Sequence, residues 1–341
     1  MRKDKTLQAA LAALMLACLG TTAQASSWRI NSDAAKKPHV ADINAAMASE
    51  KVVAGDTLYL DPGTALTTEQ NVTKQVTIIG CGYFLGNAPH QAATISATTN
   101  LKAAGIKVEA VDMVGIVAFA DDIVIERCKT GSISRSGDAV RNLTVRQCYV
   151  ANGHIIGDYS KASCTGWVVE NCYVFCQQYL HVIEGLNSPI VRNNYIRLNY
   201  NNTTPKPVAA VTNGVIINNI IINQYYPNVD YLEVTNCTVS NNLLSAAEGT
   251  YSYADTHCGT TDEQVFFQMQ GQNDQRFRLA DDSPARGAAI DGGDCGPTGG
   301  RYPYVCSGFP LGMPYFESST VPSRPQDGLL RVTQKVVQQA E

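Results

Sequence analysis

A short motif recurs through the middle of the chain, and its spacing limits the possible fold more than any other feature of the sequence. A β-branched residue and a charged or polar residue are followed by a second polar residue, Cys or Asn, and a further apolar run. The six copies are VIERCKT, TVRQCYV, VVENCYV, IVRNNYI, VIINNII and EVTNCTV, which start near residues 124, 144, 168, 190, 215 and 233. Their central residues, at positions 128, 148, 172, 194, 219 and 237, follow one another at steps of 20, 24, 22, 25 and 18 residues. Strand-like repeats of this length with no helical pattern between them predict a solenoid.

The alternation inside the motif predicts which side chains face the core. An inner aliphatic row is expected from Ile125, Val145, Val169, Val191, Ile216 and Val234. The chain is expected to bend at Arg127, Gln147, Asn171, Asn193, Asn218 and Asn236. Asparagine tolerates left-handed backbone angles, and stacked asparagines can hydrogen-bond along a row. Cys128, Cys148, Cys172, Asn194, Asn219 and Cys237 are then expected in one buried column, and the frame extends back to Cys81.

Two rows are expected on the outer surface of the coil. Charges of alternating sign at Glu126, Arg146, Glu170 and Arg192 would pair between neighbouring turns. Tyr149, Tyr173 and Tyr195 would occupy one outward row on three consecutive turns. Exposed aromatic faces on a flat sheet can stack on sugar rings, so this row is a candidate ligand-binding surface. The alternative is a structural row of tyrosines covered by a loop.

The ends of a solenoid need caps, and the sequence offers one at each end. Residues 26–75 are expected to form an N-terminal cap, with a helix inside 40–52 that buries Ile43, Ala46 and Met47, and a strand within 55–63. The solenoid itself is expected over 76–275. Residues 276–341 are expected to form a loop-rich C-terminal cap and a wrapped tail. Cys295 and Cys306, on either side of a Gly/Pro-rich loop, are the best candidates for a disulfide.

Residues 1–25 have the pattern of a signal peptide. A basic start, MRKDK, precedes the apolar stretch LQAALAALMLACLG, and AQA at 23–25 matches a cleavage site. A lipoprotein anchored through Cys18 is the alternative, although Met15 and Leu19 match a lipobox poorly. No later apolar run is long enough to span a bilayer. The net charge of −4 gives no electrostatic reason to expect nucleic acid as a partner.

Together the opening INAAM…GDTLYLDPGT, the repeated N-C-x-V turns and the closing FRL…DSPARGA resemble right-handed parallel β-helix proteins of the pectin-lyase-like superfamily. GCGYFLGNAPH and the GGDCGPTGG…PYVCSGFP tail make the chain most similar to uncharacterised secreted β-helix proteins of Bacteroidetes. The resemblance implies an all-β, single-stranded right-handed parallel β-helix with an N-terminal capping helix and a loop-rich C-terminal cap. Activity is not implied, since the superfamily contains lyases, hydrolases, epimerases, adhesins and proteins of no assigned activity.

The catalytic sets of the superfamily's polysaccharide enzymes are incomplete in this chain. The paired Asp of polygalacturonase-like hydrolases is matched at Asp121 and Asp122, but no Gly-His-Gly or Arg-x-Lys follows. Weaker acid–base candidates lie in two loops that leave neighbouring turns. They are His154, Asp158 and Lys161 in the first loop, and His181 and Glu184 in the second. Polar loop residues without a catalytic role are the simpler interpretation of these five.

No cofactor is predicted, and the scattered histidines and cysteines give no metal motif. Calcium is a weaker option, through Asp291 and Asp294 in DGGD or through the paired Asp121–Asp122 and Asp281–Asp282, and none of these completes a calcium motif. The favoured function is a secreted or surface β-helix that binds polysaccharide or surface glycan without catalysis. The alternatives are a polysaccharide lyase or glycoside hydrolase with a divergent site, and a purely structural surface element.

Overall fold

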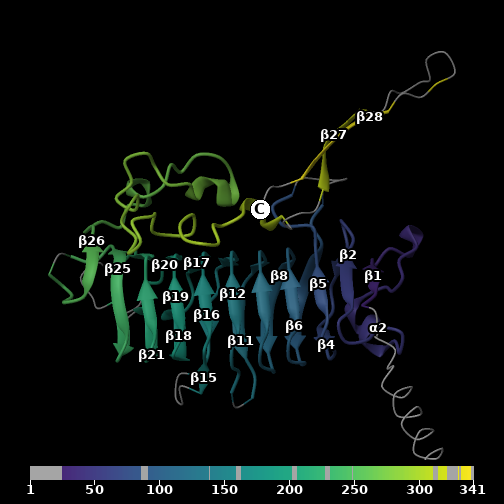
Figure 1. The fold of residues 1–341 in the computed structure, drawn as a ribbon, viewed down its shortest axis with the longest axis horizontal. Coiled ribbons are helices and arrows are strands. Elements are labelled where there is room, and N and C mark those ends of the chain that lie inside the picture. Colours follow the sequence, from purple (N-terminus) through teal and green to yellow (C-terminus); the bar gives the residue numbers. More distant parts are fainter. Residues whose placement is uncertain are drawn as a thin grey trace, which may run out of the picture.

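The fold is an all-β parallel β-helix, as the repeat predicts. A computed structural model describes residues 25–85, 91–137, 139–158, 163–201, 206–226, 231–247, 249–309, 314–320, 329 and 332–338. Strands β1 to β26 join in one sheet of 26 strands whose neighbours run parallel (Figure 1). Most of the expected signal peptide, Cys18 included, lies outside the described residues. Within the described part of the chain, no helix combines the length and the apolar character needed to cross a membrane.

Each turn of the coil that carries the motif contains three short strands separated by bends. The first strands are β5 (Thr77–Ile79), β7 (Lys107–Glu109), β9 (Val124–Glu126), β12 (Thr144–Arg146), β16 (Val168–Glu170), β19 (Ile190–Arg192) and β22 (Val215–Ile217). The second strands are β10 (Lys129–Thr130), β13 (Tyr149–Ala151), β17 (Tyr173–Cys176), β20 (Tyr195–Leu198) and β23 (Ile220–Asn223). The third strands are β11 (Ser132–Arg135), β14 (Ile155–Ile156) with β15 (Cys164–Thr165), β18 (His181–Asn187), β21 (Lys206–Thr212) and β24 (Leu232–Thr235).

Longer or shorter strands complete both ends of the coil. At the N-terminal end these are β1 (Ser27–Ile30), β2 (Thr57–Leu60), β3 (Ala65–Leu66), β4 (Gln70–Val72), β6 (Thr94–Leu101) and β8 (Asp112–Ala118). At the other end they are β25 (Thr238–Leu244) and β26 (Ala254–His257). The predicted capping helix is present but short: α2 (Ile43–Ala48) starts at the N-cap Asp42 and buries Ile43, Ala46 and Met47. A short 3₁₀ helix, η1 (Ala34–Lys36), precedes it.

The bend between first and second strands has the predicted left-handed backbone. Its residues with positive φ, between 50° and 59°, are Arg127, Gln147, Asn171, Asn193, Asn218 and Asn241. A second bend, between third and first strands, also uses positive φ, at Asp122, Asn142, Gly166, Ser188, Asn213 and Asn236. Asparagine and glycine recur at both bends because they tolerate this conformation at low cost.

The predicted buried column is confirmed for its first five members. The backbone N–H of Cys148 donates to Cys172 Sγ at 3.4 Å, and that of Cys172 donates to Asn194 Oδ1 at 2.9 Å. Asn194 N–H donates in turn to Asn219 Oδ1 at 3.0 Å. All of these side chains are buried. Cys172, Asn194 and Asn219 therefore each satisfy a backbone donor of the preceding turn.

The sixth copy of the motif is placed wrongly by the sequence frame. Strand β25 pairs Val239 with Ile216, so the column continues to Asn242, whose Oδ1 accepts from Asn219 N–H at 3.0 Å. Cys237 lies one bend earlier, where its sulfur accepts from Gly214 N–H. Asn236 belongs to the second bend and donates to Asn213. The error arises because both bends favour asparagine, so the residue type alone does not distinguish them.

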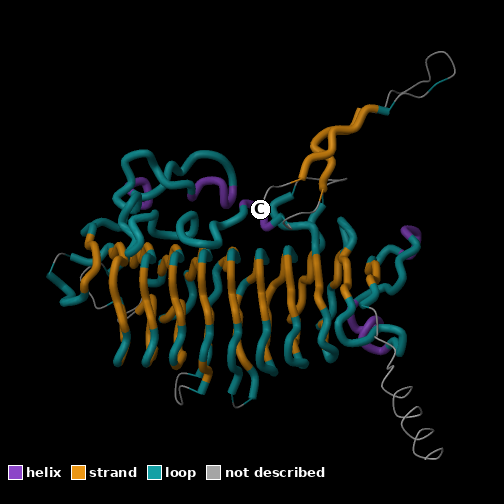
Figure 2. Tube along the Cα trace, in the orientation of Figure 1, coloured by secondary structure: helices purple, strands orange, loops and turns teal. Residues whose placement is uncertain are grey.

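The C-terminal strap, defined as residues 258–309, runs back along the coil instead of only closing its last turn. In Figure 1 it lies across one side of the β-helix, and Figure 2 shows it as loop with short helical turns. These turns are η2 (Glu263–Val265), η3 (Asn273–Phe277) and η4 (Cys306–Gly308). Beyond the strap, β27 (Pro314–Thr320) and β28 (Thr333–Gln338) form an antiparallel hairpin that projects from the body. The expectation of a wrapped tail is therefore wrong.

Side chains of the first bend fasten the strap to the coil. The Asn241 amide donates to Ala288 O at 3.1 Å, and the Asn171 amide donates to Pro297 O and Gly299 O at 2.9 and 2.7 Å. Gln147 donates to Pro303 O at 2.6 Å. Strap residues therefore run in the direction opposite to the stacking of the turns. The amides of Asn171, Asn193 and Asn241 bind strap carbonyls, so the predicted hydrogen-bonded row along this bend is wrong for them.

The course of the strap also rules out the predicted disulfide. Both Cys295 and Cys306 are free thiols in the structure. The Cys295 thiol donates to Asn241 O at 3.2 Å, near the last turns of the coil. Cys306 lies in η4, whose Gly308 packs against the backbone of Arg127 several turns away. The strap therefore crosses several turns between the two cysteines and keeps them apart.

The charged outer row forms ion pairs, with one change of partner. Glu170 lies between two arginines, with Arg192 Nη2 at 2.6 Å and Arg146 Nε at 3.5 Å, as the alternating signs predict. Glu126 pairs instead with Arg127 and Lys107, at 2.7 and 3.1 Å. Arg127 is almost wholly buried, so this charge needs the carboxylates beside it.

Candidate functional site

The predicted tyrosine row exists but is not exposed. The register places Tyr149, Tyr173 and Tyr195 side by side on β13, β17 and β20. The strap covers Tyr173 and Tyr195, which are 1% and 0% exposed, whereas Tyr149 is partly buried against Phe84 and Phe175. The Tyr173 hydroxyl donates to Phe277 O at 2.8 Å, and the Tyr195 hydroxyl donates to Glu263 Oε1 at 2.5 Å. The expectation of an exposed binding platform is wrong. The row is instead the surface on which the strap packs.

Among the candidates of the first loop, His154 and Asp158 differ in burial and in their partners. The His154 ring lies 3.9 Å from the Tyr179 ring, centroid to centroid, and burial lowers the pKa of His154 to about 4. Its imidazole is therefore neutral near pH 7. Asp158 is 3% exposed, lies 3.3 Å from Arg135 and accepts from the Ser163 hydroxyl at 2.8 Å. Lys161 lies outside the described residues.

The second loop candidates, His181 and Glu184, are brought together on β18. His181 Nε2 and Glu184 Oε2 are 4.0 Å apart, and both side chains are partly exposed. Burial raises the pKa of Glu184, and the charge of His181 opposes that shift. The β14–β18 register places Ile156 beside Glu184, which puts the two candidate loops on adjacent turns. A catalytic role for these residues stays a prediction.

An exposed aromatic surface does exist, on the loops between the second and third strands. We define the aromatic edge as residues 177–180, 199–201 and 224–226, on three consecutive turns. Tyr179 is 38% and Tyr225 is 52% exposed, while Tyr200 and Tyr226 are partly exposed. Leu180, at 37% exposure, extends the apolar part of this surface.

Backbone and side-chain hydrogen bonds between neighbouring loops give them the same regular spacing as the strands of the coil. Asn199 N–H donates to Cys176 O at 2.8 Å, which continues the strand register into the loops. The Tyr226 hydroxyl donates to Asn201 Oδ1 at 2.9 Å, linking two neighbouring loops. Arg197 donates to Gln224 Oε1 at 2.5 Å. Neighbouring loops therefore follow one another at the strand spacing of about 4.8 Å.

The edge tyrosines could have been found from the repeat itself. Tyr179 follows Cys172 by seven residues, and Tyr200 and Tyr225 follow Asn194 and Asn219 by six. His154 follows Cys148 by the same six residues, and its ring contacts that of Tyr179 at an interplanar angle of 41°. Rings thus recur six or seven residues after the motif on four successive turns.

Among the aspartates considered for calcium, Asp121, Asp291 and Asp294 accept hydrogen bonds from backbone N–H groups. Asp291 Oδ1 and Asp294 Oδ1 accept from the N–H groups of Gly293 and Gly287, at 3.1 and 3.0 Å. Asp121 accepts from Arg141 N–H at 2.8 Å. Across the described ranges, His, Cys, Asp and Glu side chains form no group of three or more suited to a metal ion.

Comparison with known proteins supports no specific activity. No protein-family model matches the sequence, and no curated protein matches it. Among solved structures, the chain is similar to a rhamnogalacturonan lyase with a TM-score of 0.42 and 12% sequence identity. The alignment covers 76% of this chain and 95% of the lyase chain. Function therefore has to be argued from the residues of this protein.

Proposed function

We propose that this protein binds polysaccharide or surface glycan without cleaving it, and that the aromatic edge is the contact surface. The observation that carries the proposal is the exposure of Tyr179 and Tyr225, two turns apart, on loops of the aromatic edge that also present side-chain amides. Tyrosine rings offer flat apolar faces to sugar rings, and amides donate and accept hydrogen bonds with hydroxyl groups. A row that repeats along the coil suits an extended polymer better than a compact ligand.

The edge needs little rearrangement to bind. Its loops are fixed by strand hydrogen bonds and by the Tyr226–Asn201 contact. Side chains already ordered by such contacts lose less conformational entropy when a ligand binds. Tyrosine combines a large contact area with few rotatable bonds, so it loses little conformational entropy when an exposed ring binds a ligand.

The test is affinity electrophoresis of the chain without residues 1–25 in gels that contain a panel of neutral and acidic polysaccharides. Tyr179→Ala with Tyr225→Ala should weaken retention by the bound polysaccharide about ten-fold or more. Phe119→Ala is the matched control, because Phe119 is 41% exposed but lies away from the edge. Equal retention of the double variant and the unaltered protein would exclude the edge as the binding surface.

A second candidate function is cleavage of a polysaccharide, favoured by the pair of His181 and Glu184. A carboxyl group with a raised pKa beside an imidazole suits general acid–base work at a sugar ring. Incubation with the same polysaccharides should be scored for new reducing ends and for unsaturated products. Product formation that Glu184→Gln abolishes would establish the enzyme and overturn the non-catalytic proposal.

We further propose export of the protein through residues 1–25. Expression in a bacterial host with an intact secretion pathway should give a chain that begins at Ser26, measured by intact mass. Lipid attached to Cys18 would instead support the lipoprotein alternative, and an unprocessed Met1 would contradict export.

A further inference from the structure

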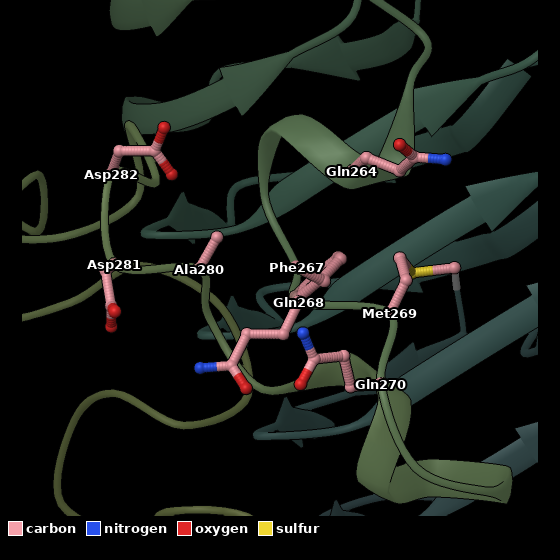
Figure 3. A pocket seen from close by; sticks show the side chains of 8 residues that line it. All are labelled: Gln264, Phe267, Gln268, Met269, Gln270, Ala280, Asp281 and Asp282. Atoms are coloured by element: carbon pink, nitrogen blue, oxygen red, sulfur yellow. The ribbon is translucent and has the colours of Figure 1, made fainter.

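A pocket on the outer side of the strap offers a second polar surface. It is an open depression of about 670 Å³, within the range of roughly 300–1,000 Å³ for small-molecule sites. Its polar lining consists of Gln264, Gln268, Gln270, Asp281 and Asp282, with Phe267 among the apolar residues. In Figure 3 the side chains of Gln268 and Gln270 lie next to each other and extend to the same side.

The backbone around the pocket is held by a small antiparallel pairing within the strap. Gln268 N–H donates to Arg278 O at 2.8 Å, and Ala280 N–H donates to Phe266 O at 3.0 Å. The Gln268 amide also donates to Leu279 O at 3.2 Å, which fixes that side chain. The pocket is therefore preformed, with one amide already oriented.

Beneath the pocket lies the covered tyrosine row. Phe267 is 1% exposed, and its ring centroid is 4.7 Å from that of Tyr195 and 5.6 Å from that of Phe277. Phe267 thus fixes the pocket segment to the aromatic cluster, and the partly exposed Met269 and Ala280 supply the accessible apolar lining. Polar groups beside an apolar lining are typical of sites that take a sugar-sized ligand.

The charges of the lining residues favour uncharged sugars over acidic ones. None of the described residues that line the pocket is positively charged, whereas two are aspartates. Asp281 is 3.6 Å from Arg286, and the side chains of Gln270 and Asp282 make no hydrogen bond with other described residues. Free amides and carboxylates accept from hydroxyl groups, and the carboxylates repel a uronate.

A chain of contacts joins the pocket to the aromatic edge. Gln224 accepts from Arg197, Arg197 Nε lies 2.7 Å from Glu263 Oε1, and Glu263 precedes Gln264 of the pocket wall. A glycan on the edge therefore has a second polar surface near its path.

We infer that this pocket is a subsite for one neutral, uncharged sugar unit and that it discriminates against uronic acids. The inference rests on the proposed glycan-binding function and names the sugar class that one part of the surface selects. It follows from the absence of a cation among the described lining residues, from the two carboxylates and from the preformed polar and apolar lining.

The experiment is saturation-transfer NMR and calorimetry with maltose, cellobiose, lactose and digalacturonate as probes. At least one neutral disaccharide should bind the unaltered chain, and digalacturonate should bind about ten-fold more weakly or not at all. Gln270→Ala and Asp282→Ala should each lower affinity for the neutral probe several-fold without loss of folding, since neither side chain is hydrogen-bonded to another residue of the described part of the chain. Gln272→Ala is the matched control, because Gln272 is exposed and lies outside the pocket.

The outcomes separate this inference from the proposed function. Neutral binding that is lost in Asp282→Ala but kept in the Tyr179→Ala, Tyr225→Ala double variant supports the pocket. No binding of any neutral probe, or tighter binding of digalacturonate, overturns it even if the edge still retains polysaccharide. Neutral binding that depends only on the edge tyrosines also overturns the pocket and leaves the proposed function standing.

Discussion

Two rows of aromatic residues follow the same coil, and only one of them faces solvent. Tyr173 and Tyr195, on the second strands, lie under the strap and are almost wholly buried. Tyr179, six residues after Tyr173, and Tyr225, on the turn that follows Tyr195, are 38% and 52% exposed. The composition of the two rows is alike, so the difference comes from what packs on them. An aromatic row in a solenoid can serve as a ligand-binding surface only where no other segment of the chain packs on it.

The largest loss of stability is expected from a substitution in the covered tyrosine row. Tyr173→Ala removes a fully buried ring that contacts Phe277 and a hydroxyl bonded to Phe277 O, and should cost roughly 3–5 kcal/mol of unfolding free energy. Urea denaturation followed by circular dichroism measures it. Tyr173→Phe keeps the ring and should lose only about 1 kcal/mol. A Tyr173→Ala variant as stable as the unaltered protein would mean that the strap does not depend on this row.

The asparagine column should give the next largest effect. Asn194→Ala removes the acceptor for Cys172 N–H and the donor to Val169 O, both buried, and should cost roughly 2–3 kcal/mol in the same assay. Asn194→Cys is the matched variant, because Cys172 fills this role one turn earlier by accepting from Cys148 N–H. It should be less damaging than Ala. Equal losses would show that the column only needs a small side chain.

Acid should destabilise the exposed row more than the covered one, through His154. The pKa of His154 is lowered to about 4 by burial, below its unfolded value of about 6.5. The unfolded chain therefore binds more protons between these values, and stability falls as pH drops from about 6.5 toward 4. Because the ring is only half-buried, the loss should stay near about 1 kcal/mol. His154→Phe should flatten this part of the stability–pH curve, and an unchanged slope would contradict the assignment.

The smallest expected effect is that of Tyr225→Ala on stability. Its exposed ring should contribute within about 0.5 kcal/mol, in contrast to the buried Tyr173. Urea denaturation should therefore place this variant with the unaltered protein while its polysaccharide retention falls. A loss of stability as large as that of Tyr173→Ala would remove the distinction between the two rows.

The sequence by itself determined the coil. The spacing of Cys128, Cys148, Cys172 and Asn194 predicted parallel turns, because a strand repeat of about 22 residues has to stack its buried residues to cover them. The left-handed bends and the capping helix at Ile43–Ala48 followed from local preferences of asparagine and from helical periodicity. These features depend on neighbours in sequence or on the next turn.

Tertiary structure alone decided which surfaces remain free. The strap lies far along the chain from the tyrosines that it covers, and its hydrogen bonds to Asn171 and Gln147 join residues more than 100 positions apart. No local pattern near Tyr173 records that contact. The same applies to the last turn, where only packing distinguishes Asn236 from Asn241. The strand determines which side chains point outward, but the packing of the whole chain determines which of these are exposed. The candidate site consists of exposed side chains, so it depends on the whole fold.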